Sequence, residues 1–246
     1  MTTLFISDLH LEIDRPDIGE QFFAFIETEA RQADALYILG DLFDAWVGDD
    51  DPNPHFADVK AAIRKLVDSG VPVYFMHGNR DFMIGEDFAR ESGVTILPDP
   101  VAVDLHGKHV LLSHGDALCT DDVEYQKIRV MTRNPDWQAM MRAKPLEERM
   151  LLARAAREES KARGQSIDMD IMDVNDAAVT RTILDYGVDI LLHGHTHRPG
   201  IHFIELDDRV AKRIVLGDWY DQGSVLQWDE DGPALKQLPR VQPNSR

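Results

Sequence analysis

The segment LFISDLH, residues 4–10, joins a short apolar run to an Asp-x-His pair and sets a pattern that recurs along the chain. An apolar run without polar alternation is typical of a strand covered on both faces. Asp8 and His10 lie two residues apart, so on extended chain both side chains point to the same side. Further apolar runs end in similar residue types, and they lie at 35–39, 71–76, 110–112 and 190–192.

The spacing of apolar residues between the first three runs is helical. It predicts helices over about 18–30 and 56–67, and Gly70 is the stop signal of the second. Strands that alternate with helices in this way predict parallel pairing with right-handed crossovers. We therefore expect an α/β fold in a single domain, residues 1–246.

The later parts of the chain differ from this βαβ pattern. Residues 94–113 contain three apolar segments and no room for a helix, and residues 201–228 are typical of hairpins. The sheet should therefore be mixed or divided into two sheets. Residues 237–246 are expected to form a loose polar tail.

The charge is unevenly distributed. The chain has 26 Lys and Arg against 44 Asp and Glu, a net charge of −18, which argues against nucleic acid as a partner. Between Tyr125 and Arg163, however, ten basic residues face five acidic ones, so this stretch carries +5 and the remainder −23. Its composition is helical, and we predict a helical insertion at about 123–168.

Cysteine usage and the N-terminus indicate the compartment. The single cysteine, Cys119, excludes an internal disulfide, fits a reducing compartment and is expected to be buried and inert. No basic stretch precedes the first apolar residues, and no uncharged apolar run reaches the roughly 18 residues that span a bilayer. We expect a soluble, cytoplasmic protein, and a monomer because no heptad seam is present.

Residues that ligate metals stand at the end of each apolar run. In open α/β sheets, sites form at the carboxyl ends of strands, so these blocks should lie together. Oxygen ligands mixed with imidazoles suit Mn²⁺, Fe²⁺ or Zn²⁺. Each block alone is common in turns, and it is their recurrence that predicts a metal site. The blocks are Asp8-Leu9-His10, Gly40-Asp41, Gly78-Asn79, His114-Gly115 and His193-Gly194-His195-Thr196-His197.

The order of these blocks resembles that of the calcineurin-like metallophosphoesterases. The resemblance implies two sandwiched mixed sheets flanked by helices, with two divalent metal ions at the strand ends. One ion would be held by Asp8, His10 and His197. The other would be held by Asn79, His114 and His195, and Asp41 would bridge the two. Catalytic roles would fall to Asp41, Asn79, His114 and His195, around a metal-activated water that attacks phosphorus.

Arg80 departs from the pattern of that superfamily. Many members have His at this position, which is taken to protonate a departing alkoxide. Arginine is no general acid, because its pKa exceeds about 12. The leaving group should then need no proton, as when a phosphate departs from a pyrophosphate, and Arg80 would bind phosphate oxygens. The alternative is a surface salt bridge.

Longer strings resemble the UDP-2,3-diacylglucosamine hydrolases within this superfamily, and they occupy 41–50, 78–82, 114–122, 171–175 and 193–199. The resemblance implies hydrolysis of the pyrophosphate bond of a lipid-linked UDP-sugar. The products would be UMP and 2,3-diacylglucosamine 1-phosphate (lipid X), with attack on the uridine-side phosphorus. It further implies Mn²⁺, a role in lipid A biosynthesis, and a peripheral position on the cytoplasmic face of a bacterial inner membrane.

The substrate contacts of that family fall on Asn79, Arg80, Asp122, Ser160 and His195. Two further contact positions fall on Gly164 and Ile167, which lack the polar side chains expected there. The insertion would act as a lid for the acyl chains, and the alternative is an insertion whose Met and Leu residues pack on the main domain.

Two other functions stay open at this point. A general metallophosphoesterase would act on another phosphodiester or nucleotide, and Arg80 argues against it. A scaffold without catalysis would be free to lose ligands, whereas all seven positions hold competent residue types. The acidic run Asp49-Asp50-Asp51 lacks a calcium-loop pattern and is expected to be a solvated turn.

Overall fold

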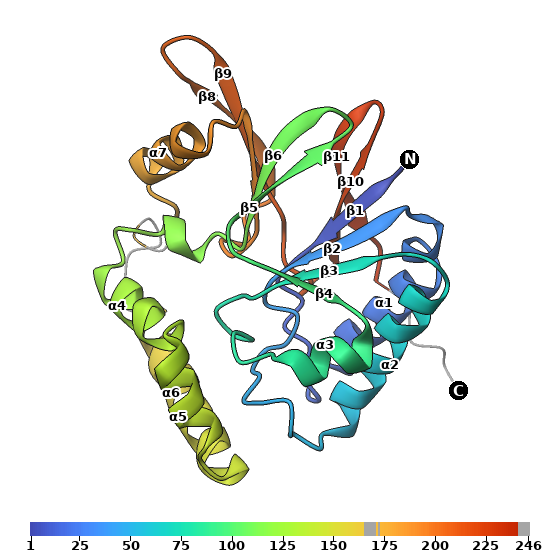
Figure 1. Ribbon diagram of the computed structural model, residues 1–246, viewed down its shortest axis with the longest axis vertical. Coiled ribbons are helices and arrows are strands. Elements are labelled where there is room, and N and C mark those ends of the chain that lie inside the picture. Colours follow the sequence, from blue (N-terminus) through green and yellow to red (C-terminus); the bar gives the residue numbers. More distant parts are fainter. Residues whose placement is uncertain (165–170, 172, 241–246) are drawn as a thin grey trace.

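The computed structural model describes residues 1–164, 171 and 173–240. Six strands form the first sheet, in the order β11-β10-β1-β2-β3-β4 (Figure 1). Strands β1 to β4 pair in parallel, and β10 and β11 add antiparallel strands at one side. The bounds are β1 Thr3–Ile6, β2 Ala35–Leu39, β3 Val73–Met76, β4 Thr95–Leu97, β10 Gly223–Asp229 and β11 Gly232–Leu238.

Five strands form the second sheet, in the order β5-β6-β7-β9-β8. Its three central strands run parallel, and its edge strands β5 and β8 are antiparallel to their neighbours. The predicted division into mixed sheets is thus confirmed. The bounds are β5 Val101–Leu105, β6 Lys108–Ser113, β7 Ile190–His193, β8 Gly200–Glu205 and β9 Val210–Val215.

The α-helices of the described residues comprise four that flank the sheets and three in the insertion, and two short 3-10 helices lie at Ala30–Gln32 and Asp116–Leu118. None of the helices in the described part of the chain is both long and apolar enough to cross a bilayer. The flanking helices are α1 Pro16–Glu27, α2 Pro54–Asp68, α3 Glu86–Ser92 and α7 Asp176–Tyr186. The insertion contains α4 Val123–Thr132, α5 Pro135–Arg142 and α6 Leu146–Gly164.

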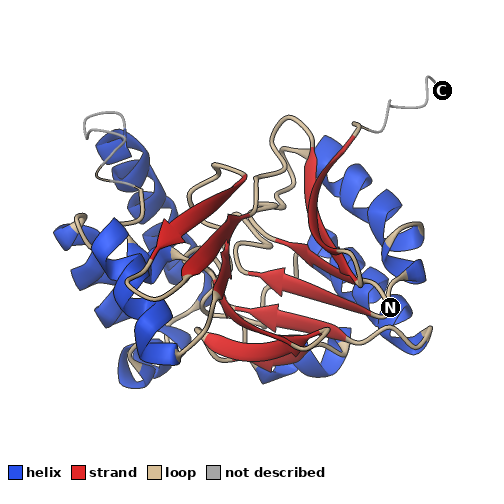
Figure 2. Ribbon diagram, turned by 90° about the horizontal axis from the view of Figure 1, so that it is seen from above, coloured by secondary structure: helices blue, strands red, loops and turns tan. Residues whose placement is uncertain are grey.

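The sheets pack face to face with helices on both outer sides (Figure 2). The alternation of side chains along the strands builds these layers, because successive residues face opposite sides. In β1, Phe5 lies in the core between the sheets, whereas Leu4 and Ile6 belong to the core shared with α1 and α2. In β7, Leu191 packs with residues of α7 instead. Strands covered on both faces explain the unbroken apolar runs of the sequence.

Some elements differ from the sequence-based expectation. Helices α3 and α7 lie in stretches for which no helix was predicted. Strand β11 pairs with β10 as far as Leu238, so the expected polar tail begins later than residue 237. Asp49 is no solvated turn residue either, since it is half-buried and accepts hydrogen bonds from the backbone N–H groups of Gly85 and Phe88.

The insertion projects away from the sheets as an arm (Figure 1). Helices α4 and α5 contain no buried residue, although Trp137 and Met141 are partly buried and pack against the core that the first sheet shares with α1 and α2. Many apolar side chains of the arm therefore face solvent. They are Val123, Ile128, Val130, Met131, Met140, Leu151 and Leu152.

Candidate metal centre

The predicted ligands follow the carboxyl ends of β1, β2, β3, β6 and β7, on loops of unusual backbone. Left-handed φ angles of 50–70° are uncommon for residues other than glycine, though Asp, Asn and His are enriched among the exceptions. At Gly78 and Gly194 a Cβ atom would stand 2.1 Å from an oxygen of Asp41 and 2.4 Å from one of Asp8. Five ligand positions have such angles: Asp8 (56°), His10 (51°), Asp41 (52°), His195 (69°) and His197 (56°).

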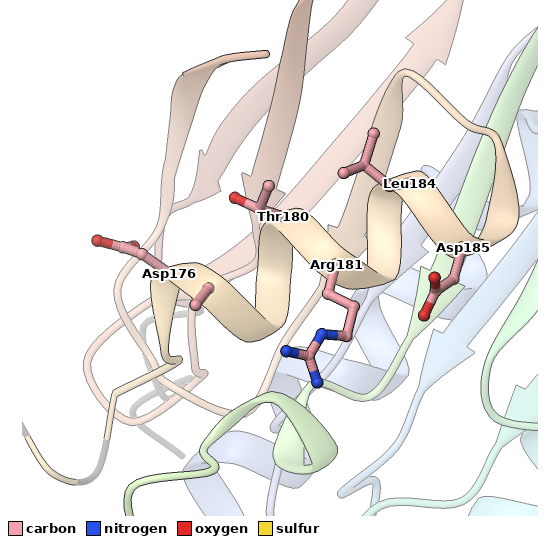
Figure 3. Close-up of a pocket in the computed structure, with 6 residues that line it drawn as sticks. Asp176, Thr180, Arg181, Leu184 and Asp185 are labelled. Carbon is pink, nitrogen blue, oxygen red and sulfur yellow. The ribbon is translucent and has the colours of Figure 1, made fainter. Parts of the chain in front are cut away.

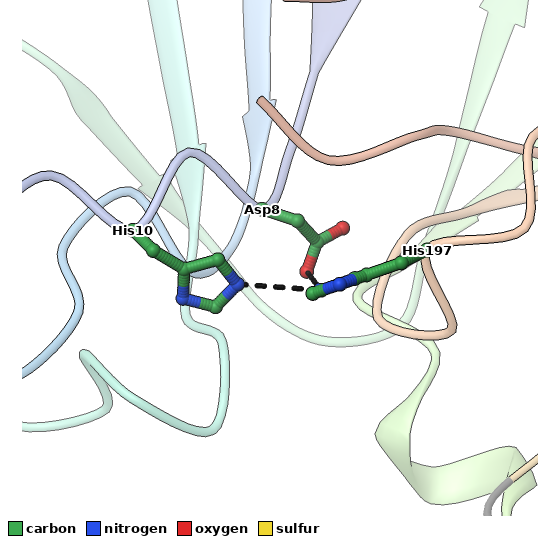
Figure 4. Close-up of side chains that lie close together, drawn as sticks. All are labelled: Asp8, His10 and His197. Atoms are coloured by element: carbon green, nitrogen blue, oxygen red, sulfur yellow. Dashed lines mark hydrogen bonds and ion pairs between the residues drawn. The ribbon is translucent and has the colours of Figure 1, made fainter. Parts of the chain in front are cut away.

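Asp8, His10 and His197 form the first ligand group (Figure 4). The Nε2 atoms of the two histidines lie 3.3 Å apart, and His197 Nε2 is 3.5 Å from Asp8 Oδ1. Two nitrogens that share a cation at about 2.1 Å each would lie roughly 3.0–3.4 Å apart. Asp8 Oδ1 is buried with no hydrogen-bond partner in the described chain. The group therefore fits a divalent cation.

Asn79, His114 and His195 form the second ligand group. Asn79 Oδ1 lies 2.8 Å from His114 Nε2 and 2.9 Å from His195 Nδ1, so the three side chains converge on one point. His114 Nδ1 donates to the carbonyl oxygen of Leu39 at 2.8 Å, which leaves Nε2 with a free lone pair for a metal.

Asp41 lies between the two groups. Its Oδ2 is 3.9 Å from His10 Nε2, and its Oδ1 is 3.7 Å from His114 Nε2. Asp8, Asp41 and His114 also offer ligand atoms within 4.8 Å of one another. The two oxygens of Asp41 thus face one histidine of each group, which is the arrangement that a bridging ligand requires.

The electrostatics of the centre reflect crowded charges. Burial raises the pKa of Asp41 to about 7. Burial alone would lower the pKa of His114, but the nearby carboxylates of Asp41, Asp116 and Asp8 raise it to about 9. Burial lowers the pKa of His195 to about 4. Such a cluster of ionisable groups suits the binding of cations, which would compensate the negative charge.

A segment that the sequence analysis missed supports the first ligand group. Asp218 Oδ2 lies 3.4 Å from His197 Nδ1, and the ring of Tyr220 stacks on that of His10 at 5.4 Å. The backbone N–H of Trp219 donates to the carbonyl oxygen of Asp8. Carboxylate partners of metal-binding histidines fix the ring orientation. No local motif marks these residues, because their role depends on tertiary contacts with ligands elsewhere in the chain, 21 positions away for Asp218 and about 210 for Trp219 and Tyr220.

Two further carboxylates organise the ligand loops. Asp81 is buried and accepts hydrogen bonds of 2.8 Å from the backbone N–H groups of Leu42 and Gly78, which ties the Asp41 loop to the Asn79 loop. Asp116 is buried two positions after His114 and contacts α4. Both lie within the ranges 78–82 and 114–122 that carry the family resemblance, but the sequence analysis assigns them no role.

The predicted substrate contacts lie in different parts of the structure. Arg80 stands beside the centre, with its backbone N–H donating to Asp41 Oδ1 at 2.8 Å. Its guanidinium has no hydrogen-bond or ion-pair partner among the residues described, so the expected alternative of a salt bridge is not seen there. Asp122 caps α4 by accepting from the N–H of Tyr125, and Ser160 lies exposed on α6. Gly164 ends α6, and Ile167 lies outside the described residues.

Cys119 is buried as expected, and burial raises the pKa of its thiol to about 12, which disfavours the reactive thiolate. A separate surface hollow contains none of the predicted ligands (Figure 3). It is lined by one helix alone, through Asp176, Ala177, Thr180, Arg181, Leu184 and Asp185 of α7.

Comparisons with known proteins agree with this geometry. The model of the calcineurin-like phosphoesterase family matches residues 1–199. A UDP-2,3-diacylglucosamine hydrolase of Stenotrophomonas maltophilia (strain R551-3) is 52% identical, and the match covers 98% of this chain and 100% of that protein. The enzyme of the same name from Enterobacter sp. (strain 638) is also 52% identical, over 97% and 100% of the two chains.

One solved structure, of an archaeal phosphodiesterase, is 14% identical with a TM-score of 0.48, and covers 97% of this chain and 99% of its own. The assignment rests on the sequence matches rather than on this likeness. With a family match over residues 1–199 and full-length relatives at 52% identity, the chain belongs to the calcineurin-like phosphoesterase family.

Proposed function

We propose that the protein hydrolyses the pyrophosphate bond of UDP-2,3-diacylglucosamine, a step of lipid A biosynthesis. The products are UMP and 2,3-diacylglucosamine 1-phosphate, and water attacks the uridine-side phosphorus. The observation that carries this proposal is identity of 52% along the whole chain to relatives named for that hydrolysis. The convergence of seven competent ligands supports a working catalyst rather than a scaffold.

Two divalent metal ions are the cofactor of this reaction. The first would be held by Asp8, His10 and His197, the second by Asn79, His114 and His195, with Asp41 between them. When bound, such a pair stabilises charge on phosphoryl oxygens and supplies hydroxide near neutral pH. The oxygen and imidazole donor set, without thiolates, is compatible with Mn²⁺, the ion that the resemblance to the UDP-2,3-diacylglucosamine hydrolases implies.

Arg80 determines which bond is cleaved. Its guanidinium is near enough to the centre to lower the pKa of both Asp41 and Tyr220, although burial outweighs this effect on each. A permanently charged fork of donors can bind phosphate oxygens but cannot protonate a leaving group. A pyrophosphate needs no such proton, because its leaving phosphate is already a stable anion. The chain is therefore suited to a phosphoanhydride.

The insertion accounts for the lipid half of the substrate. Exposed apolar side chains on α4, α5 and α6 offer a surface for acyl chains, and the excess of basic residues favours an anionic membrane. Asn79, Asp122, Ser160 and His195 would complete the substrate contacts. We place the protein as a peripheral monomer on the cytoplasmic face of the inner membrane.

The site of attack is tested with metal-free protein reconstituted with Mn²⁺ and incubated with UDP-2,3-diacylglucosamine in ¹⁸O-labelled water. We expect one label in UMP. A label in the lipid phosphate would reverse the direction of attack, and absence of turnover would remove the proposed substrate. The alternative of a general phosphoesterase predicts faster turnover of a phosphodiester such as bis(p-nitrophenyl) phosphate than of the lipid-linked substrate.

The role of Arg80 is tested by Arg80→Ala, with Arg80→Lys as the matched variant. We expect Arg80→Ala to lower kcat/KM by at least 100-fold at unchanged metal content, because a charged partner of phosphate is lost. Arg80→Lys should recover part of the activity through its charge. Loss of bound metal from either variant would show that Arg80 is structural.

A further inference from the structure

We propose that α4 positions the second ligand group, and that Tyr125, Arg129 and Arg133 couple the insertion to this half of the metal centre. These are positioning residues, since each acts through a ligand or a ligand loop. The inference rests on the proposed metal centre but not on the identity of the substrate.

The contact is organised around the buried carboxylate of Asp116. Its Oδ2 accepts a hydrogen bond of 2.6 Å from Tyr125 Oη and one of 3.0 Å from Arg129 Nε. Arg133 Nη2 lies 3.6 Å from the same oxygen. Tyr125 and Arg129 are four residues apart on α4, and Arg133, its C-cap residue, follows four residues later, so one face of the helix is directed at a single acceptor. Gln126 adds donations to the carbonyl oxygens of Asp116 and Cys119.

Each member of the second ligand group has its own link to α4. The ring of Tyr125 stacks on that of His195 at 6.0 Å. Arg133 Nη2 donates to the carbonyl oxygen of Gly78 at 3.0 Å, directly before Asn79. Helix α4 therefore contacts one ligand ring and the backbone that carries another.

The third link reaches His114 through Asp99. Arg129 Nη2 donates to Asp99 Oδ2 at 3.4 Å, and Asp99 Oδ1 accepts from the backbone N–H of His114 at 3.3 Å and from Ser113 Oγ at 2.8 Å. Asp116 itself follows His114 by two residues. The loop of His114 is thus held from both sides by partners of Arg129.

The first ligand group has different support. His197 and His10 contact Asp218 and Tyr220, which come from the segment between β9 and β10. The contacts of α4 therefore fall on the second group and those of the segment between β9 and β10 on the first, while the two groups meet where Asp8 Oδ2 accepts from the backbone N–H of His195 at 2.8 Å. A change in α4 should weaken the second metal site far more than the first, and by reciprocity a cation in the second group should stabilise α4.

The experiment uses the full-length protein, stripped of metal and titrated with Mn²⁺ against a chelating indicator. Tyr125→Phe removes only the hydroxyl, and Arg133→Met keeps the length of the side chain. We expect both variants to bind one Mn²⁺ with nearly the affinity of the wild type. The other Mn²⁺, assigned to the second ligand group, should bind about 10–100-fold more weakly, as is typical when an outer partner of a metal ligand is lost. Arg133→Lys should restore part of the second affinity.

Matched controls separate positioning from general destabilisation. Lys127→Ala removes a cation from the same helix, whose ion-pair partner at 2.6 Å is Glu124 of that helix, and should leave both affinities unchanged. Asp218→Asn should weaken one site on its own, and combined with Tyr125→Phe it should weaken both. Hydrogen exchange in α4 of the wild type should slow when the second Mn²⁺ binds, and this effect should be lost in Tyr125→Phe.

Two outcomes would overturn the inference. One is unchanged affinity for both ions in Tyr125→Phe and Arg133→Met. The other is equal weakening of both sites together with a lower unfolding temperature, which indicates a structural role alone. Because the titration needs no substrate, a protein that binds two Mn²⁺ ions as expected but does not turn over UDP-2,3-diacylglucosamine would contradict the proposed function and leave this inference standing.

Discussion

At the scale of single residues, two of the candidate ligands carry protons that a bound cation would displace. A pKa of about 7 for Asp41 and about 9 for His114 means that both hold protons at neutral pH or below. A cation needs the ionised carboxylate and the unprotonated imidazole nitrogen. His195, with a pKa of about 4, is already neutral and releases none.

We therefore predict that metal affinity rises with pH between about 6 and 9 and that binding releases protons. The rise should approach tenfold per pH unit for each proton displaced. Calorimetric titration with Mn²⁺ in buffers of different ionisation enthalpy measures the number of protons released. Equal heats in all buffers at pH 7.5 would contradict the prediction.

The candidate ligands stand out in the sequence because each stands at the end of an apolar run, and the structure brings them close together. Their supporting residues were not, since Asp218 and Tyr220 reach His197 and His10 only through the tertiary fold. Tyr125 is similar, because nothing in its local sequence indicates a ring stacked on His195. Residue types indicate candidate ligands, whereas the residues that support those ligands are identified only by their contacts in the structure.

At the scale of elements, α3 begins in an unusual way. Its N-cap, Gly85, has no side chain to accept from the first N–H groups. Asp49 from a distant loop accepts instead, with Oδ1 3.0 Å from the N of Gly85 and Oδ2 3.0 Å from the N of Phe88. Its Oδ1 also accepts from Trp46 Nε1. A remote carboxylate thus replaces the local cap.

We predict that Asp49→Ala lowers the free energy of unfolding by about 1–3 kcal/mol, because backbone donors at this helix end lose their acceptor. Asp49→Asn keeps one acceptor oxygen and should cost less. Urea unfolding followed by circular dichroism gives both values. If both variants were as stable as the wild type, the hydrogen bonds of Asp49 to α3 would make no contribution to the free energy of unfolding.

This remote cap also explains which elements the sequence revealed. Apolar runs in the sequence indicated strands β1, β2, β3, β6 and β7. The helical spacing of apolar residues between the first three runs indicated α1 and α2. Helix α3 is short and lacks a local cap, so no start signal stood out. Helix α7 did carry signals, with Asn175 as its N-cap and Gly187 in left-handed conformation at its end. The start and end of α7 are therefore set by local residues, unlike the start of α3.

At the scale of the whole molecule, charge is divided between two regions. The insertion carries +5 between residues 125 and 163, against −23 elsewhere. We predict binding to vesicles that contain anionic phospholipid, weakening as salt rises from 50 to 300 mM, despite the net charge of −18. Vesicle flotation measures the bound fraction. Equally strong binding to purely zwitterionic vesicles would contradict the predicted electrostatic attraction between the insertion and anionic lipid.

Paired variants locate this surface. Arg142 and Arg154 are exposed on the insertion, and Arg181 is exposed on α7. Each basic residue near an anionic surface contributes about 1 kcal/mol, so Arg142→Ser with Arg154→Ser should weaken binding roughly 10–30-fold. Arg181→Ser should have no effect. An equal loss in the Arg181→Ser control would mean that the insertion is not the contacting surface.

The left-handed backbone of the ligand loops restricts which substitutions this protein can accept during evolution. Asp, Asn and His are among the few residues with side chains that tolerate such angles, and they are also the types that ligate metals. The main chain and the cation therefore select the same amino acids at Asp8, His10 and Asp41. A descendant that had lost its metals would still be held to Asn or Gly there, and so would keep the shape of the loops long after the chemistry had gone.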